Sequence, residues 1–132
     1  YSGQELPNKK RLEFFEKDPI EWTDNNTLQG FYKTLLQLKS SHPALRAGDP
    51  AVHTYRIKTS DPKHVFAYLR QHGDKKIMVI LNLSSQNDLH CEITDPLVKG
   101  RFNNAFSGAA NDFTTDKQFE MQAWEYLVYT AE

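Results

Sequence analysis

The hydrophobic pattern of the chain is strongest between residues 64 and 84. Two runs rich in β-branched and aromatic residues, 64–70 and 77–84, flank a polar stretch with a Gly-Asp pair, which is typical of a β-hairpin. A helix is the competing interpretation of such an apolar run, but the turn residues and the β-branched content favour strands. Apolar side chains alternate on both faces of the second run, so we expect a central strand with Val79 and Leu81 facing the inside of the domain.

Helical periodicity precedes this hairpin. Residues 23–26 form a cluster of good N-cap residues, and an apolar stripe follows at helical spacing. Pro43 disfavours helical geometry at the residue before it, so the helix should stop near Ser41. We therefore expect one amphipathic helix over residues 27–41, whose stripe consists of Leu28, Phe31, Leu35 and Leu38, widened by Tyr32 and Leu36. Residues 1–26 lack sustained periodicity, and we expect a loop there with a single helical turn.

The spacing of apolar residues changes from helical to alternating at Ala51. Further strands are expected over the following segments, each ended by Asp, Asn, Pro or Gly: 52–57, 89–93, 101–106, 117–121 and 123–129. Residues 111–116 should form a turn or a weak edge strand.

Short strands without intervening helices predict antiparallel pairing. The expected fold class is mainly β, an antiparallel β-sandwich of Greek-key type preceded by the one helix, with a compact barrel as the alternative. Gly48 and Pro50 lie where the periodicity changes, which places a domain boundary between Arg46 and Ala51 and divides the chain into 1–46 and 47–132.

Composition limits the classes of partner. The chain has 132 residues, 39% of them hydrophobic, which suffices for a real core. Sixteen Lys and Arg residues against 17 Asp and Glu residues give a formal charge of −1, so neither nucleic acid nor an acidic membrane surface is indicated as a partner. No apolar run has the length of a membrane span. The sequence begins at Tyr1 and not at Met, and we expect it to be a piece of a longer protein.

A search for catalytic or cofactor motifs finds none. The glycines do not approach the spacing of a phosphate-binding loop, and the serines lie in turn or helix-end contexts. The only cysteine, Cys91, is expected to be an inert strand thiol. No metal-ligand spacing relates the five histidines, which are His42, His53, His64, His72 and His90. We predict no catalytic, cofactor-binding or metal-binding residue in this chain.

Two further groups of residues invite a functional interpretation. Paired carboxylates can act as acid and nucleophile in a glycosidase, but a solvated charged loop is the better interpretation of Glu5, Glu13, Glu16, Asp18 and Glu21. Aromatic rings could stack on sugars, and the candidates are Trp22, Tyr55, Tyr68, Trp124, Tyr126 and Tyr129. Most of these should face a core, whereas Trp22 lies in a polar loop and is the best candidate for an exposed ring.

Several segments together resemble the C-terminal portion of α-amylase family glycoside hydrolases, which have a (β/α)8 barrel followed by an all-β domain. The resemblance covers essentially the whole chain. Residues 1–5, Tyr-Ser-Gly-Gln-Glu, look like the Tyr-x-Gly-x-Glu motif at the end of the eighth barrel strand. Residues 11–22 are similar to the following connector, 31–48 look like the eighth helix and its exit, and 66–84 are similar to the central hairpin of the C-terminal domain.

The resemblance implies a parent enzyme that hydrolyses or transfers α-linked glucans, with residues 1–46 as a remnant of its barrel. The family's three catalytic carboxylates would all precede Tyr1, and Glu5 is not one of them. The calcium site often found in the family likewise relies on other parts of the parent. The fragment alone is therefore expected to lack glycosidase activity.

Two functions follow as alternatives. The chain could be a non-catalytic domain that caps or stabilises the barrel, or an autonomous carbohydrate-binding module for starch-like glucans. The implied partners are the missing barrel of the same chain and, for the second alternative, an α-glucan. An apolar stripe left in water would forgo about 1.5 to 3 kcal/mol for each side chain, so the helix at 27–41 should fold back on the sandwich, pair with a second copy or fray. Of these we favour self-association through the helix.

Overall fold

The computed structural model describes residues 2–131 and divides into two compact units, 1–40 and 41–132. Each unit is described by itself. Tyr1, the first residue of the motif at 1–5, lies outside the described residues.

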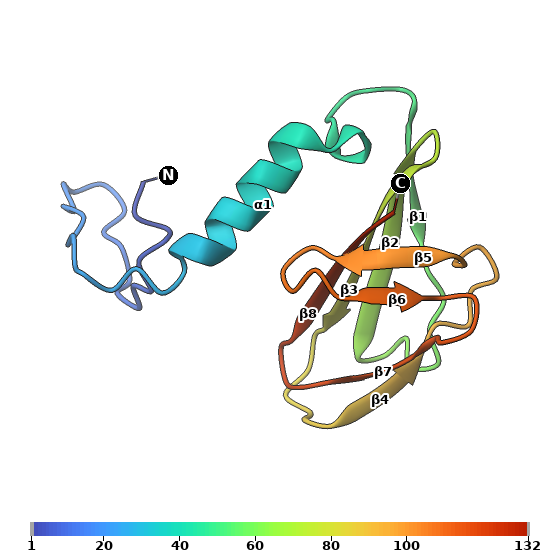
Figure 1. Cartoon of the computed structure of the whole chain (residues 1–132). Coiled ribbons are helices and arrows are strands. Elements are labelled where there is room, and N and C mark those ends of the chain that lie inside the picture. The colour runs from blue at the N-terminus through green and yellow to red at the C-terminus, as the bar shows by residue number, and fades with distance from the viewer. Residues whose placement is uncertain (1, 132) are drawn as a thin grey trace. The chain divides into compact units, whose positions relative to one another are not determined.

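The first unit holds turns, bends and most of the helix α1. Residues 2–28 contain no α-helix or 3-10 helix, so the single helical turn expected within 1–26 is absent from the described residues. Leu6 is the buried apolar residue among those described there. Helix α1 spans Gln29–Ser41 and ends where Pro43 predicts, although it begins two residues later than expected (Figure 1). None of its residues is fully buried.

The second unit contains a short 3-10 helix and eight strands. Their bounds are η1 Pro43–Leu45, β1 Val52–Arg56, β2 Val65–His72, β3 Lys75–Asn82, β4 Leu89–Glu92, β5 Arg101–Asn104, β6 Ala110–Asp112, β7 Gln118–Met121 and β8 Tyr126–Ala131. One sheet has the order β1-β2-β3-β8-β5-β6, and the other consists of β4 and β7. All pairs are antiparallel, and the chain passes between the sheets before and after β4 and β7 (Figure 1).

This arrangement confirms the predicted mainly β fold with a sandwich. The central hairpin forms β2 and β3, joined by a two-residue turn in which Gly73 takes a φ of 61°. Glycine at the first central position is what a type II′ hairpin turn requires. Of the segment 111–116, expected to be a turn or weak edge strand, residues 111–112 belong to β6 at the edge of the larger sheet and residues 113–115 form a turn.

The core lies between the two sheets and includes Met78 and Ile80 of β3. Since side chains alternate along a strand, Val79 and Leu81 point to the opposite, outer face of the larger sheet. The expectation that these two residues face the inside of the sandwich was wrong. An apolar strand does not reveal which of its two faces meets the second sheet.

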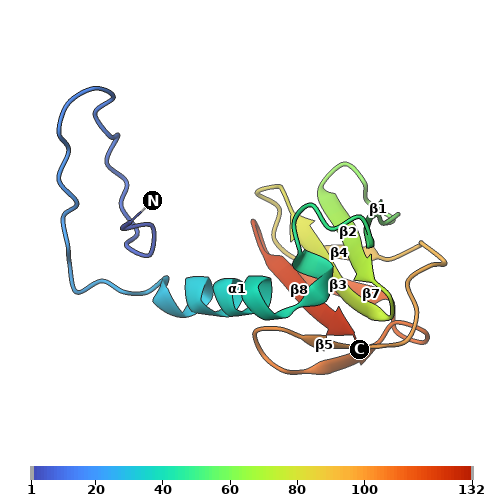
Figure 2. The same cartoon turned by 90° about the horizontal axis from the view of Figure 1, so that it is seen from above.

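The outer face has a cover of its own at one end. Arg70 donates from Nε to the carbonyl oxygen of Ala44 at 2.9 Å and from a terminal nitrogen to the oxygen of Arg46 at 3.3 Å. These bonds hold η1 against β2 and β3, as Figure 2 shows, with Ala44 and Ile77 buried. The segment 42–46 therefore packs with the β-strands, and the compact units divide a few residues before the boundary expected at 46/47. The assignment of residues 1–46 to a barrel remnant stays a prediction.

Candidate functional site

Of the five carboxylate residues of the opening segment, Glu13, Glu16 and Glu21 are exposed, whereas Glu5 and Asp18 are half-buried. Asp18 accepts a hydrogen bond from Lys10 Nζ at 2.5 Å and another from the backbone of Glu13 at 3.1 Å. The bond from Lys10 is the main reason that the pKa of Asp18 lies below its ordinary value. Glu13, Glu16 and Asp18 line an open hollow of about 660 Å³ in this unit. Asp18 is thus neutralised by Lys10 and has a side chain only 9% exposed, so the interpretation as a solvated charged loop describes Glu13, Glu16 and Glu21 but not Asp18.

The histidines stay apart from one another. Three of them approach a carboxylate: His64 lies 2.8 Å from Asp61, and the distances are 3.7 Å for His72 and Asp49 and 3.8 Å for His90 and Glu120. Within residues 2–131, no three His, Cys, Asp or Glu side chains gather as metal ligands would.

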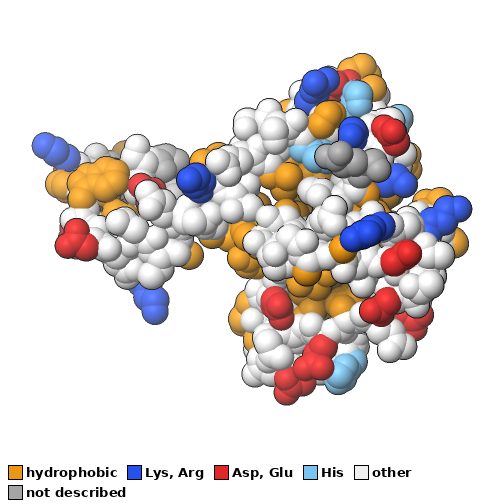
Figure 3. Space-filling view, viewed as in Figure 1, with side chains coloured by type: hydrophobic (Ala, Val, Ile, Leu, Met, Phe, Trp, Pro, Cys, Tyr) orange, Lys and Arg blue, Asp and Glu red, His pale blue; other side chains and the backbone are white. Residues whose placement is uncertain are grey.

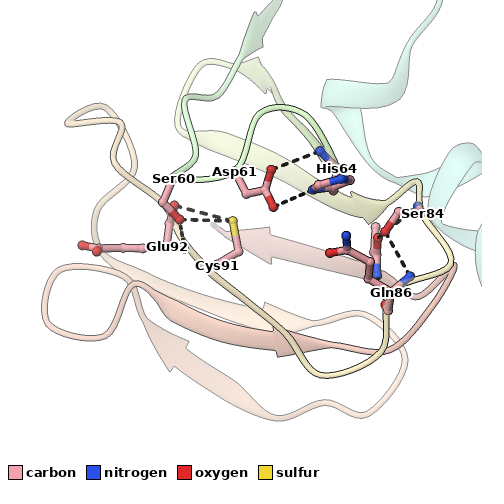
Figure 4. Close-up of polar contacts among 8 residues, drawn as sticks. Ser60, Asp61, His64, Ser84, Gln86, Cys91 and Glu92 are labelled. Atoms are coloured by element: carbon pink, nitrogen blue, oxygen red, sulfur yellow. Dashed lines mark hydrogen bonds and ion pairs between the residues drawn. The ribbon is translucent and has the colours of Figure 1, made fainter.

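Ser60, Asp61, His64 and Cys91 lie near one another but form two separate contacts (Figure 4). Ser60 Oγ lies 3.6 Å from Cys91 Sγ and accepts the backbone N–H of Glu92 at 2.9 Å, while Nδ1 of His64 lies 2.8 Å from Asp61. The bond to His64 holds the pKa of Asp61 below its ordinary value. Cys91 is buried, as expected for an inert strand thiol. These contacts join the loop after β1 to β4 and close a turn.

A buried amide organises the loops at the end of β3. Asn82, only 1% exposed, donates from Nδ2 to the carbonyl oxygens of Gln86 at 2.9 Å and Gln122 at 2.8 Å. Its Oδ1 accepts the backbone N–H of Ser84 at 3.0 Å and the hydroxyl of Ser84 at 2.7 Å. Figure 4 shows Ser84 and Gln86 in this network. Four hydrogen bonds satisfy the amide and fix the loops before β4 and before β8.

The aromatic residues divide differently from the expectation. Trp22 and Trp124 are each 66% exposed, so Trp22 is not the better exposed ring of the two. Tyr55 and Tyr126 are also exposed, whereas Tyr68 and Tyr129 are half-buried. Burial raises the pKa of the Tyr129 hydroxyl, and its ring meets that of Phe113 at a centroid distance of 5.1 Å.

An apolar row crosses the outer face of the larger sheet at the end away from η1. Phe66 pairs with Leu81, and Leu81 pairs with Tyr126, so three adjacent strands contribute neighbouring side chains. The ring of Phe106 extends the row, with its centroid 5.2 Å from that of Tyr126. We call these four residues the outer row. Phe66 and Phe106 are each 37% exposed and Tyr126 is 40% exposed. Single exposed apolar side chains are common on protein surfaces, whereas a contiguous exposed apolar patch often marks an interaction surface.

A hollow of about 330 Å³ opens between β6 and β7, where the two sheets are not joined. Its floor includes Ile80 and Phe113 of the core, and amide side chains such as Asn104 and Gln118 lie at its rim. Figure 3 shows apolar atoms between β6 and β7 of the second unit, which we call the β-unit from here on.

Sequence reasoning identified the exposed ring of Trp22 but missed the outer row and the role of Asn82. The row depends on strand register, which joins residues far apart in the sequence. An asparagine inside the apolar run 77–83 was the available signal for a buried polar anchor. Among the described residues, no helix is long and apolar enough to cross a bilayer.

Comparisons with known proteins agree with this architecture. Residues 55–128, from β1 to β8, match the family model described as Maltogenic Amylase, C-terminal domain. The chain is 26% identical over 124 residues to an oligo-1,6-glucosidase from Parageobacillus thermoglucosidasius, covering 93% of this chain and 20% of the relative. It therefore spans about a fifth of the length of that curated protein.

Two solved structures share the fold. A maltogenic α-amylase from Thermotoga neapolitana superposes with a TM-score of 0.73 at 18% identity, covering 98% of this chain and 32% of that one. A trehalose-6-phosphate hydrolase from Bacillus licheniformis gives a TM-score of 0.55 at 24% identity, covering 75% of this chain and 17% of that one. Since the family model spans more than half of the sequence, from the edge strand β1 to the central strand β8, the chain belongs to the family of maltogenic amylase C-terminal domains.

Proposed function

We propose that this chain is the non-catalytic C-terminal part of an amylase-like glycoside hydrolase acting on α-linked glucans, and that its β-unit caps and stabilises the catalytic barrel. The outer row carries this proposal. The larger sheet already has a complete core on its inner face, so Phe66, Leu81, Tyr126 and Phe106 are not needed to close the sandwich. A contiguous exposed apolar patch of this kind is typical of a surface that meets another folded body.

The barrel is the occupant that the comparisons favour. The relatives are much longer than this chain, which spans 20% of the glucosidase and 32% of the maltogenic amylase. Arg56 lies over the ring of Phe66, with its guanidinium carbon 5.7 Å from the ring centroid, and adds a polar rim to the row. An apolar centre with a polar rim matches the anatomy of an interface between domains.

The test compares Phe66→Asp with Leu97→Asp in the parent enzyme and in the 132-residue chain. Leu97 is 63% exposed and lies between β4 and β5, away from the outer row, so it is a matched control for an added charge. We expect Phe66→Asp to lower the inactivation temperature of starch hydrolysis by several degrees, because about 1 kcal/mol corresponds to about 4–8 °C in a domain of about 60–100 residues, the size of the second unit. In the 132-residue chain the same change should have a smaller effect on melting. Equal effects in the two proteins, or equal effects of the two substitutions, would contradict the proposal.

The apolar stripe on α1 supports a related proposal for the isolated chain. Phe31, Leu35 and Leu38 of the helix are only partly covered, and Leu36 is 65% exposed. Leu28, which was expected in the same stripe, lies in the turn just before α1 and is half-buried. In the parent the barrel would cover this stripe, and in the isolated chain a second copy would do so. Sedimentation at several concentrations should show dimers that Phe31→Glu combined with Leu35→Glu abolishes. A wild-type monomer at all concentrations would refute self-association.

A further inference from the structure

Two loops at the end of the outer row form one rigid structure. They comprise residues 83–88 and 122–125, and we call them the paired loops. The Asn82 amide bonds to both, the backbone N–H of Trp124 donates to Ser84 at 3.1 Å, and that of Ala123 donates to Asn87 Oδ1 at 3.1 Å. The loops therefore hold each other in place without a bound ligand.

The backbone of the paired loops adopts an uncommon conformation at one position in each loop. Asp88 has a φ of 53° and Trp124 a φ of 61°, and these are the only non-glycine residues with positive φ among those described. Gln122, two residues before Trp124, ties the second loop to Asp88, because its Nε2 donates to Asp88 Oδ1 at 2.9 Å. A left-handed backbone is unfavourable for a tryptophan, and such residues cluster at binding sites where the surrounding structure enforces them.

Apart from Trp124 itself and Leu83, which is 57% exposed, the large side chains of the paired loops are polar. The paired loops carry Gln86, Asn87, Asp88, Gln122 and Glu125, whereas the centre of a protein interface is depleted in charged groups. Loops that carry a large flat ring together with amides and carboxylates offer both an apolar face and hydrogen-bonding groups of both kinds. Asn87, Asp88 and Glu125 each use one oxygen within the loops and keep a second acceptor site. A sugar ring needs this combination, because its C–H face is apolar and its edge carries hydroxyls that donate and accept.

We propose that the paired loops form a carbohydrate-binding site in which Trp124 stacks on a glucose unit of an α-linked glucan. The amide and carboxylate side chains of the loops bind the hydroxyls at the edge of that ring. The choice of an α-linked glucan rests on the proposed function, while the site itself rests on the geometry of the paired loops. Because the loops are already ordered, little conformational entropy is lost on binding.

Trp22 provides a matched control within the same chain. It has the same exposed fraction, 66%, but it lies in the first unit, has no positive φ, and no hydrogen bond ties its backbone to a second loop among the described residues. If exposure alone sufficed for sugar binding, the two tryptophans would be equivalent.

The experiment titrates the 132-residue chain with maltoheptaose and with cellohexaose. Trp22→Phe leaves Trp124 as the sole tryptophan, since the chain has two, so its fluorescence reports on this site alone. We expect a saturable change with maltoheptaose and a weaker one with cellohexaose. By calorimetry, Trp124→Ala should lower the affinity for maltoheptaose at least about tenfold, as for a central aromatic anchor. Trp124→Phe should lower it less, and Trp22→Ala should leave it unchanged.

Gln122→Ala tests the polar part of the site. It removes the bond to Asp88, so we expect a loss of affinity of several-fold with an unchanged far-ultraviolet spectrum. The proposal is overturned if no saturable signal appears up to about 10 mM maltoheptaose, tenfold above a millimolar Kd, or if Trp124→Ala and Trp22→Ala have equal effects. Binding of cellohexaose as tightly as maltoheptaose would overturn the assignment to α-linked glucans. None of these outcomes depends on the barrel, so failure here leaves the stabilising role of the outer row to its own test.

Discussion

The two faces of strand β3 have the same kind of side chains but different surroundings. On the inner face, Met78 and Ile80 are completely buried between the sheets. On the outer face, burial falls along the strand, from Ile77 at 1% exposed through Val79 at 9% to the half-buried Leu81. The inner face is closed by the protein's own second sheet, and the outer face is closed only where η1 reaches it.

This difference shows that an apolar strand face predicts burial but does not identify the element that packs on it. Both faces of β3 predict burial equally well from the sequence. One face is covered by distant strands of the same unit and the other by the segment 42–46 at one end. The uncovered remainder is the outer row, where we propose that the barrel packs.

The largest expected effect separates the two faces directly. Ile80→Ala opens a cavity in a core that cannot collapse easily, and it should destabilise the β-unit by about 2–5 kcal/mol. Leu81→Ala removes a half-buried side chain and should cost about 1 kcal/mol, roughly half of a full burial term. Urea melts of the 132-residue chain measure both. Equal losses would mean that the two faces of β3 are equally closed.

The next effect concerns the end of β3, where the buried amide of Asn82 holds the loops through hydrogen bonds. Asn82→Ala leaves the carbonyl oxygens of Gln86 and Gln122 without their donor, and it should cost about 1–3 kcal/mol. Asn103→Ala is the matched control, because Asn103 is exposed, and its loss should be within about 0.5 kcal/mol. If both changes have the same small effect, the network does not hold the loops.

A smaller effect is expected at the cover of the outer face. Arg70→Met removes two hydrogen bonds to the segment 42–46 while keeping an apolar stem, so it should cost about 1–2 kcal/mol. Arg70→Lys should not restore the loss, since an ammonium lacks the planar fork that reaches two carbonyls. Amide exchange should speed up at Leu45 and Arg46, whose N–H groups close the 3-10 turn. Unchanged protection there would show that η1 is held by packing alone.

The smallest effect is a pH dependence at the turn that leads from β1 to β2. The hydrogen bond with His64 lowers the pKa of Asp61 in the folded state. The stability that Asp61 contributes is therefore fully present above its unfolded-state pKa of about 3.9, and it is lost as the pH falls through the folded-state pKa. The loss should stay below about 1 kcal/mol, the range of a solvent-accessible pair. Thermal melts between pH 6 and pH 3 should show a shallower acid decline for Asp61→Asn than for the wild type. Parallel profiles would exclude this turn as an acid-sensitive element.

Local patterns predicted much of the fold. The hairpin, the end of α1 before Pro43 and the edge strand β6 follow from turn residues, proline geometry and alternation, all of which act within a few residues. The start of α1 was less well determined, because several consecutive residues at 23–26 can cap a helix.

The candidate sites depended on tertiary structure and could not be predicted in the same way. The outer row exists because Phe66, Leu81 and Tyr126 are in register across three strands. The exposure of Trp124 was missed because Trp124 lies in a β-prone run, which predicted a strand and a buried ring. Its backbone is left-handed instead, and strand β8 begins only at Tyr126. The boundary between units depended on Arg70, which lies far along the chain from the segment that it binds.

The anchoring of residues 42–46 also sets how far the second unit can be shortened at its start. Arg70 donates to the carbonyl oxygens of Ala44 and Arg46, and His42 Nδ1 accepts the backbone N–H of Ala44. A chain cut at Ala51, where the apolar spacing changes, would lose these groups and would leave the guanidinium of Arg70 without both acceptors. The shortest chain that keeps the second unit intact therefore starts at residue 42 and not at the first strand.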